Sequence, residues 1–280
     1  MRSVISNRGG SDASRARGVT SERGVVAGDP AATASMGLAP ADPARSLPLR
    51  LTLLGGFCLR AGREVVSLSP APQRLLAVLA LNDYRLRRGY VAGLLWGDST
   101  ESRANGSLRS ALWKLRGVGL RVIAVDGDDL ALSPEVDVDV ERATSLAQEV
   151  VAGSFGADTS ALLDPRLSAE LLPGWDDEWV AGARERHRQL SLHALEMLCE
   201  HLTRIGRYGA AVQAGLAAVD REPLRESAHR ALMRVHLAEG NAGEAIRRYR
   251  QYEEIAARDL GIGPSSMMRS LLSEIFTGGS

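Results

Sequence analysis

The chain has 280 residues with 34 basic and 34 acidic side chains, so its formal net charge is zero, and 45% of its residues are hydrophobic. This length and composition are typical of one or two soluble globular domains. No apolar run approaches the roughly 20 residues that span a bilayer, and residues 1–23 lack the hydrophobic middle of a secretory signal. Because Cys58 and Cys199 lie in regions predicted to be different domains, we expect no disulfide framework and a cytoplasmic location.

The zero net charge conceals a separation of charge along the chain. Residues 49–133 carry 12 basic and 7 acidic side chains, whereas residues 134–280 carry 16 basic and 23 acidic ones. A basic module followed by an acidic one indicates that the first module meets a polyanion. The alternative is an uneven distribution of solvated surface charge.

The N-terminal half is predicted to begin with a disordered tail and to continue as a small α+β domain. Residues 1–47 are rich in small residues and lack periodicity, so they cannot bury enough apolar surface to order themselves. Ser69-Pro70 marks the start of a first helix that ends near Asn82, and a second helix is expected over residues 89–96. Short β-prone runs separated by turn residues precede these helices and predict an antiparallel sheet. These runs are residues 49–54, 57–60 and 64–68.

A third helix is predicted over Asp98–Arg116, and its two faces differ. Asp98 or Ser99 can cap it, and Asp98 with Glu101 has the spacing of a capping box. The positive end of this helix leads into its polar face, which favours phosphate. The apolar stripe comprises Ala104, Leu108, Ala111, Leu112 and Leu115. The opposite face comprises Ser102, Arg103, Gly106, Arg109, Ser110, Trp113 and Lys114.

Gly106 costs about 1 kcal/mol relative to alanine in a helix interior, so it needs an explanation. Either another molecule approaches the helix backbone closely there, or the first turn of the helix is loose. After this helix, residues 122–125 and 130–132 flank Asp126-Gly127, which predicts a hairpin. A sheet, three helices and a terminal hairpin describe a winged helix-turn-helix, whose third helix enters the major groove of DNA.

The second half of the chain is predicted to be helical. Helices are expected over residues 138–151 and, as one helix or two, over residues 176–202. Two segments that begin at Ile205 and Glu239 are offset by 34 residues with their glycines matched, which is the period of tetratricopeptide helix pairs. Such pairs bury a shared core and present surfaces to partners.

Several motifs together resemble the Streptomyces antibiotic regulatory protein family. In the first half they are LLWGD at Leu94–Asp98 and GSLRSALWKLR at Gly106–Arg116, within a region similar to OmpR-type winged helices. In the second half they are PGWDDEWV at Pro173–Val180, REPLRE at Arg221–Glu226 and RDLGIGP at Arg258–Pro264, which look like the bacterial transcriptional activator domain of that family. The resemblance covers about Leu49–Phe276. The expected organisation is a tail (residues 1–47), a winged helix (48–133) and a tetratricopeptide-like activator domain (134–280).

The family resemblance implies a transcriptional activator that binds direct repeats in promoter DNA, recruits RNA polymerase and switches on a biosynthetic gene cluster. The acidic helical domain would then mediate self-association, giving a homodimer on the repeats, or polymerase contact. The alternative function is a helical-repeat adaptor for a protein or a small effector. An enzyme would need convergent polar groups that the sequence does not reveal, and no P-loop, HExxH motif or nucleophile elbow is present.

The predicted DNA contacts fall into two groups. Arg109 is the leading base-reading residue because arginine can pair with both acceptors of guanine, although a phosphate contact is its alternative. Trp113 either packs on a sugar or a thymine methyl group or covers the wing. The base-reading candidates are Ser102, Arg103, Gly106, Arg109 and Ser110. The phosphate candidates are Arg85, Arg87, Arg88, Lys114, Arg116 and Arg121.

No cofactor, metal site or membrane contact is expected. The five histidines all lie in the helical half without the spacing of a metal-binding pair, and the three tyrosines of the repeats are predicted to pack. The histidines are His187, His193, His201, His229 and His236. The tyrosines are Tyr208, Tyr249 and Tyr252.

Overall fold

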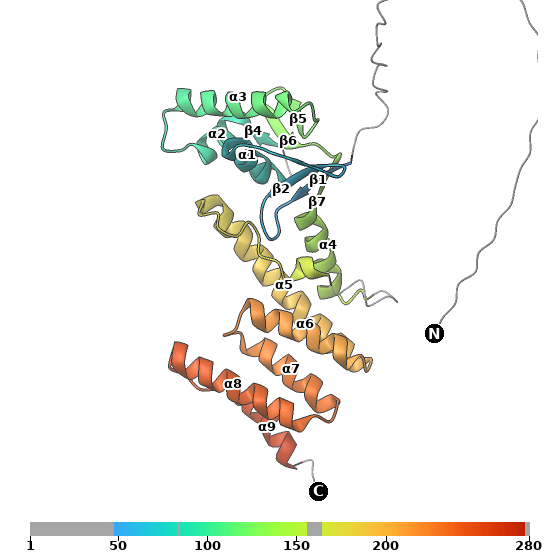
Figure 1. The fold of residues 1–280 in the computed structure, drawn as a ribbon. Coiled ribbons are helices and arrows are strands. Elements are labelled where there is room, and N and C mark those ends of the chain that lie inside the picture. The colour runs from blue at the N-terminus through green and yellow to red at the C-terminus, as the bar shows by residue number, and fades with distance from the viewer. Residues whose placement is uncertain (1–47, 83–84, 156–163, 278–280) are drawn as a thin grey trace, which may run out of the picture. The chain divides into compact units, whose positions relative to one another are not determined.

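The computed structural model of the chain describes residues 48–82, 85–155 and 164–277 (Figure 1). The tail predicted over residues 1–47 lies outside these residues. The first part contains strands β1 (Leu49–Thr52), β2 (Cys58–Ala61), β3 (Glu64–Val66), β4 (Leu86–Arg87), β5 (Ile123–Asp126), β6 (Asp129–Leu132) and β7 (Val136–Val138), with helices α1 (Pro70–Ala80), α2 (Arg88–Leu95) and α3 (Glu101–Gly117). The second part contains α4 (Asp139–Val151), the short 3₁₀ helix η1 (Pro165–Leu167), α5 (Glu178–Arg204), α6 (Tyr208–Arg221), α7 (Glu226–Ala238), α8 (Ala242–Leu260) and α9 (Ser266–Thr277).

The first part is a winged helix-turn-helix, as the sequence predicts. Its four-stranded sheet has the order β3-β2-β1-β7, and its three-stranded sheet has the order β4-β6-β5. The hairpin β5–β6 is the wing, and its register pairs Val125 with Leu130. Helices α1, α2 and α3 pack on one another, and α1 also packs on β6.

The apolar stripe predicted for the third helix is confirmed. Each of its five side chains is at most 7% exposed within the core that α3 shares with α1 and α2. Leu75 and Leu76 of α1 are completely buried in the same core. Packing of this stripe fixes the rotation of α3 about its own axis, so its opposite face must point to solvent.

Four local predictions are wrong by a few residues or miss an element. Helix α3 begins at Glu101 with Thr100 at the N-cap, whose side chain makes no capping hydrogen bond, so neither Asp98 nor Ser99 is the cap. The wing turns at residues 127–128, one residue later than predicted, because Asp126 pairs with Asp129. Val138 belongs to β7 and not to the following helix. Strand β4, formed within the basic cluster of residues 85–88, was not predicted.

The second part repeats a helix pair, as the 34-residue offset predicts. Gly206 and Gly240 both adopt positive φ, at 74° and 86°, where α5 gives way to α6 and α7 to α8. Helices α5 to α8 pack each on the next (Figure 1). The segment predicted as one helix or two is a single helix, since α5 is continuous from Glu178 to Arg204 and begins two residues later than predicted.

Tight packing holds α5, α6 and α7 together around Gly215. A Cβ atom at this position would lie 2.6 Å from Cδ2 of Leu232 and 3.2 Å from Sγ of Cys199. Both neighbours are completely buried. Glycine is therefore required here by the close approach of α6 to α7.

The two parts are joined by hydrogen bonds and not only by the chain. Strand β7 pairs in parallel with β1, and Asp139, the first residue of α4, accepts hydrogen bonds from the amides of Leu53 (2.9 Å) and Leu54 (3.1 Å). Leu54 also bridges to Leu171, just before α5. The boundary between residues 133 and 134 stays a prediction, and β7 lies just beyond it.

Candidate nucleic-acid interface

The exposed face of α3 presents all five base-reading candidates together. Ser102, Arg103, Arg109 and Ser110 are exposed, and Gly106 is half-buried. These residues share the side of the helix opposite its buried stripe, because each of the other four lies three or four residues from Gly106 along the helix. The structure therefore brings together the residues that the sequence singles out.

The cations of α3 have no acidic partner among the described residues. The guanidinium groups of Arg103, Arg109 and Arg116 make no hydrogen bond or ion pair there, and Glu101 is the only acidic residue of the helix. Lys114 Nζ lies 3.4 Å from Ser69 Oγ, a neutral group. The face thus carries uncompensated positive charge, which favours a polyanion.

Gly106 lies in the second turn of α3, so the explanation by a loose first turn is wrong. A Cβ atom added to it would meet only Nη2 of Arg109, at 3.9 Å. Nothing within the described chain therefore requires a glycine at this position. The Ser110 hydroxyl donates a hydrogen bond of 3.0 Å to the Gly106 carbonyl, which keeps this side chain close to the helix.

Trp113 extends the same face and does not cover the wing. Its side chain is 74% exposed, which contradicts packing on the hairpin. It follows Gly106 by seven residues and Arg109 by four, so it lies in line with them along α3. A large flat side chain thus stands free beside the leading base-reading residue.

The wing carries acidic residues that sequence reasoning overlooked. Arg85 pairs with Asp126, and Nε of Arg88 lies 4.0 Å from a carboxylate oxygen of Asp128. A shallow hollow at the wing turn is lined by residues that include Arg109 and Asp128, so the wing acid borders the face of α3. Two of the six phosphate candidates are therefore already paired. The signal available in the sequence was the run of three acids at 126, 128 and 129.

The other phosphate candidates remain available. Arg87, Arg116 and Arg121 are exposed and make no ion pair within the described residues. Together with Lys114 they lie on or beside α3, in β4 and in the segment that leads to the wing. These positions suit contacts that orient a protein on DNA without reading its sequence.

The helical part shows packing roles for its aromatic and cysteine side chains. Tyr249 and Tyr252 are buried, and Tyr208 packs against the core of α5, α6 and α7, as predicted. His201 stacks on Phe155 at 3.7 Å, and His229 contacts Tyr252 at 4.9 Å. Both cysteines are free, and burial raises the pKa of the Cys199 thiol to about 12.

Within the residues that the structure describes, no group of three or more His, Cys, Asp or Glu side chains is placed to hold a metal ion. In the same part of the chain, no helix is long and apolar enough to cross a membrane.

Comparison with known proteins supports the same architecture. Residues 161–276 match the family model of the bacterial transcriptional activator domain, and they follow a winged helix. This match assigns the second part of the chain, from residue 161 to 276, to that domain family. The match agrees with the motifs of the second half, which resemble the same domain.

A solved structure shares the fold of this chain. It is Mycobacterium tuberculosis EmbR, determined in complex with a low affinity phosphopeptide, and it matches with a TM-score of 0.63 and 23% identity. The match covers 84% of this chain and 66% of that one, so the chain spans just under two thirds of that protein. No curated protein matches the sequence.

Proposed function

We propose that the chain is a sequence-specific DNA-binding activator of transcription whose α3 enters the major groove of promoter DNA. The observation that carries this proposal is the exposed face of α3, where three arginines and a lysine without acidic partners surround small residues. Cations left unpaired by the chain are free to replace the counterions of a phosphate backbone. The small residues let the helix approach the base edges.

The side chains divide by role. Arg109 lies at the middle of the exposed face, beside Gly106, where the helix backbone can come closest to DNA. An arginine so placed can donate two hydrogen bonds to O6 and N7 of guanine. Ser102, Arg103 and Ser110 flank it as further base contacts. Trp113 is placed to pack on a sugar or a thymine methyl group. The phosphate contacts are Arg87, Lys114, Arg116 and Arg121.

The helical part supplies the activating function in this proposal. Its family is described as a transcriptional activator domain. Residues 134–280 carry seven more acidic than basic side chains, which keeps this part off DNA and exposes it to a protein partner. We place it against RNA polymerase or a second copy of the chain on direct repeats, in the bacterial cytoplasm, at promoters of a biosynthetic gene cluster. The winged helix (48–133) and the activator domain (134–280) are the two working units.

The test begins with selection of duplexes from a random pool by the full chain. Affinity for the selected site is then compared between the unaltered chain, Arg109→Ala and Arg250→Ala. Arg250 is an exposed arginine of α8, so the second variant removes the same charge at a distance from the interface. We expect Arg109→Ala to weaken binding by about 1–3 kcal/mol and to relax preference at one base pair. Arg250→Ala should have no effect.

Salt titration separates the two kinds of contact. Lys114→Ala should weaken binding to all sequences alike and reduce the slope of log affinity against log salt by about 0.9. Unchanged affinity and footprint in a chain carrying both Arg109→Ala and Lys114→Ala would refute the proposal. Binding to random duplex without any salt dependence would instead favour the adaptor function.

A further inference from the structure

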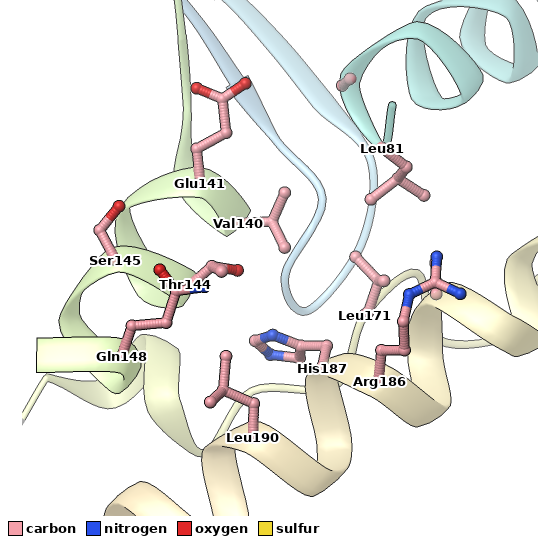
Figure 2. A pocket seen from close by; sticks show the side chains of 12 residues that line it. Leu81, Val140, Glu141, Thr144, Ser145, Gln148, Leu171, Arg186, His187 and Leu190 are labelled. Atoms are coloured by element: carbon pink, nitrogen blue, oxygen red, sulfur yellow. The ribbon is translucent and has the colours of Figure 1, made fainter. Parts of the chain in front are cut away.

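A cavity of about 450 Å³ lies between the end of α1, helix α4 and the first half of α5 (Figure 2). Its apolar wall includes Leu81, Val140 and Leu190, and its polar groups include Thr144 and Gln148. Pockets for small molecules typically measure about 300–1,000 Å³ and combine apolar walls with a few polar groups. No residue of the proposed nucleic-acid interface lines this cavity, so it is a separate site.

His187 gives the cavity a buried polar group that the described residues satisfy only in part. Its side chain points from α5 into the space beside Val140 and Thr144 of α4 (Figure 2). The residue is 5% exposed, and its Nδ1 has no hydrogen-bond partner among the described residues, while Nε2 lies 3.5 Å from the Ser191 hydroxyl. A buried nitrogen left without a partner costs free energy, so a ligand that pairs with it gains affinity.

The ring is neutral at physiological pH. Burial and, to a smaller extent, the positive charge of Arg221 lower the pKa of His187 to about 4, and this value includes the opposing effect of a hydrogen bond with the backbone of Ala169. A neutral imidazole offers one donor and one acceptor and does not attract a cation or an anion by charge. It therefore selects a hydroxyl or amide group.

The charged side chains at the rim of the cavity determine the sign of the charge that a ligand can carry. Arg186 is exposed there and makes no hydrogen bond or ion pair within the described chain; its guanidinium lies along α5 towards Gly182. Glu141 of α4 also lines the cavity, but its carboxylate points away from His187 (Figure 2). Arg186 is therefore the cation that an anionic ligand can reach.

We propose that this cavity binds a small amphipathic anion, with an apolar body, a hydroxyl or amide beside His187 and one acidic group that reaches Arg186. The cavity takes part of its wall, Ala80 and Leu81, from the end of α1, a helix that packs on α3. Occupancy therefore couples to the winged helix. This regulatory consequence rests on the proposed DNA-binding function, whereas binding itself does not.

The test uses two fluorescent probes of similar shape and the full chain. The anion 8-anilino-1-naphthalenesulfonate has an apolar body and one acidic group, and N-phenyl-1-naphthylamine has the same body without the acid. Arg186→Gln should weaken binding of the first probe about fivefold, as expected for one partly exposed charge pair, and leave the second unchanged. Arg204→Gln is the matched control because Arg204 is an exposed arginine near the far end of the same helix. Thr144→Phe, which fills the cavity from α4, should abolish the binding of both probes.

Saturable 1:1 binding with this pattern supports the site. Absence of saturable binding of both probes, or equal effects of Arg186→Gln and Arg204→Gln, overturns it, as does unchanged binding by folded Thr144→Phe. If Thr144→Phe fails to fold by circular dichroism, the two arginine variants decide.

The coupling is tested by measuring affinity for a selected duplex with and without saturating sulfonate probe. A change in DNA affinity supports regulation by the bound anion. Equal affinities refute this regulation but do not contradict the binding site. If the chain binds no duplex, the proposed function is wrong. The probe titrations still test whether the cavity binds an anion.

Discussion

Replacing Gly106 by alanine should make the protein more stable and its DNA complex weaker. Alanine favours a helix interior by about 1 kcal/mol over glycine. The added methyl group meets only Nη2 of Arg109, at the ordinary contact distance of 3.9 Å, so no packing loss offsets this gain. In a domain of 150–250 residues, 1 kcal/mol raises Tm by about 2–4 °C. Urea denaturation and thermal unfolding measure the gain directly.

The same methyl group would stand between the α3 backbone and the base edges. We expect about tenfold weaker binding to a selected duplex, equivalent to about 1.4 kcal/mol. Gly182→Ala is the matched control: it lies inside α5, and its added methyl group would meet only Nη1 of Arg186, at 3.5 Å. It should gain stability without losing DNA affinity. Unchanged affinity in Gly106→Ala would refute close approach of the helix backbone to DNA.

Four further predictions follow from the geometry. DNA should shield Trp113 from acrylamide quenching, because its exposed ring lies on the contact face. Asp126→Asn combined with Asp128→Asn should tighten binding to random duplex and steepen the salt slope by up to about 1.8, since two arginines are freed for phosphate. Gly215→Ala should cost about 1–3 kcal/mol in urea denaturation, because its methyl group has no room. The free energy of unfolding should fall by up to about 3 kcal/mol between about pH 6.5 and pH 4, because the unfolded chain protonates His187 first.

Each of these predictions has a control. Trp96, Trp175 and Trp179 are half-buried, so Trp113→Phe identifies the shielded emission. Unaltered salt slopes in the double asparagine variant would show that the wing does not face DNA. Gly209→Ala places its methyl group in open space on the same helix as Gly215 and should not destabilise the protein. The fall in the free energy of unfolding at low pH should be smaller in His187→Phe than in the unaltered chain. If the two proteins show the same pH dependence, other groups cause the fall.

The regular spacing of residues in the sequence predicted those elements that are held in place by one buried face. The stripe of α3 and the matched glycines at 206 and 240 were found because burial imposes a regular spacing and a turn repeats with its helix pair. The composition of the exposed face of α3 followed from the same pattern, since the side opposite a buried stripe is necessarily exposed.

Contacts between distant segments were beyond the sequence pattern. Strand β4 has only two residues, Leu86 and Arg87, and exists because β6 pairs with it. The pairing of Arg85 with Asp126 joins residues 41 positions apart, so neither the charge cluster nor the turn reveals it alone. The cavity beside His187 depends on three helices meeting, which no local pattern encodes.

The parallel pairing of β7 with β1 also limits how far the chain can be shortened from its C-terminal side. A fragment that ends at Ser133 would lose the three residues that cover one edge of β1, together with the carboxylate that accepts the amides of Leu53 and Leu54. An uncovered strand edge is a template for pairing with another molecule. The smallest soluble DNA-binding fragment should therefore extend through α4, which makes the first helix after the winged helix a structural cover for it.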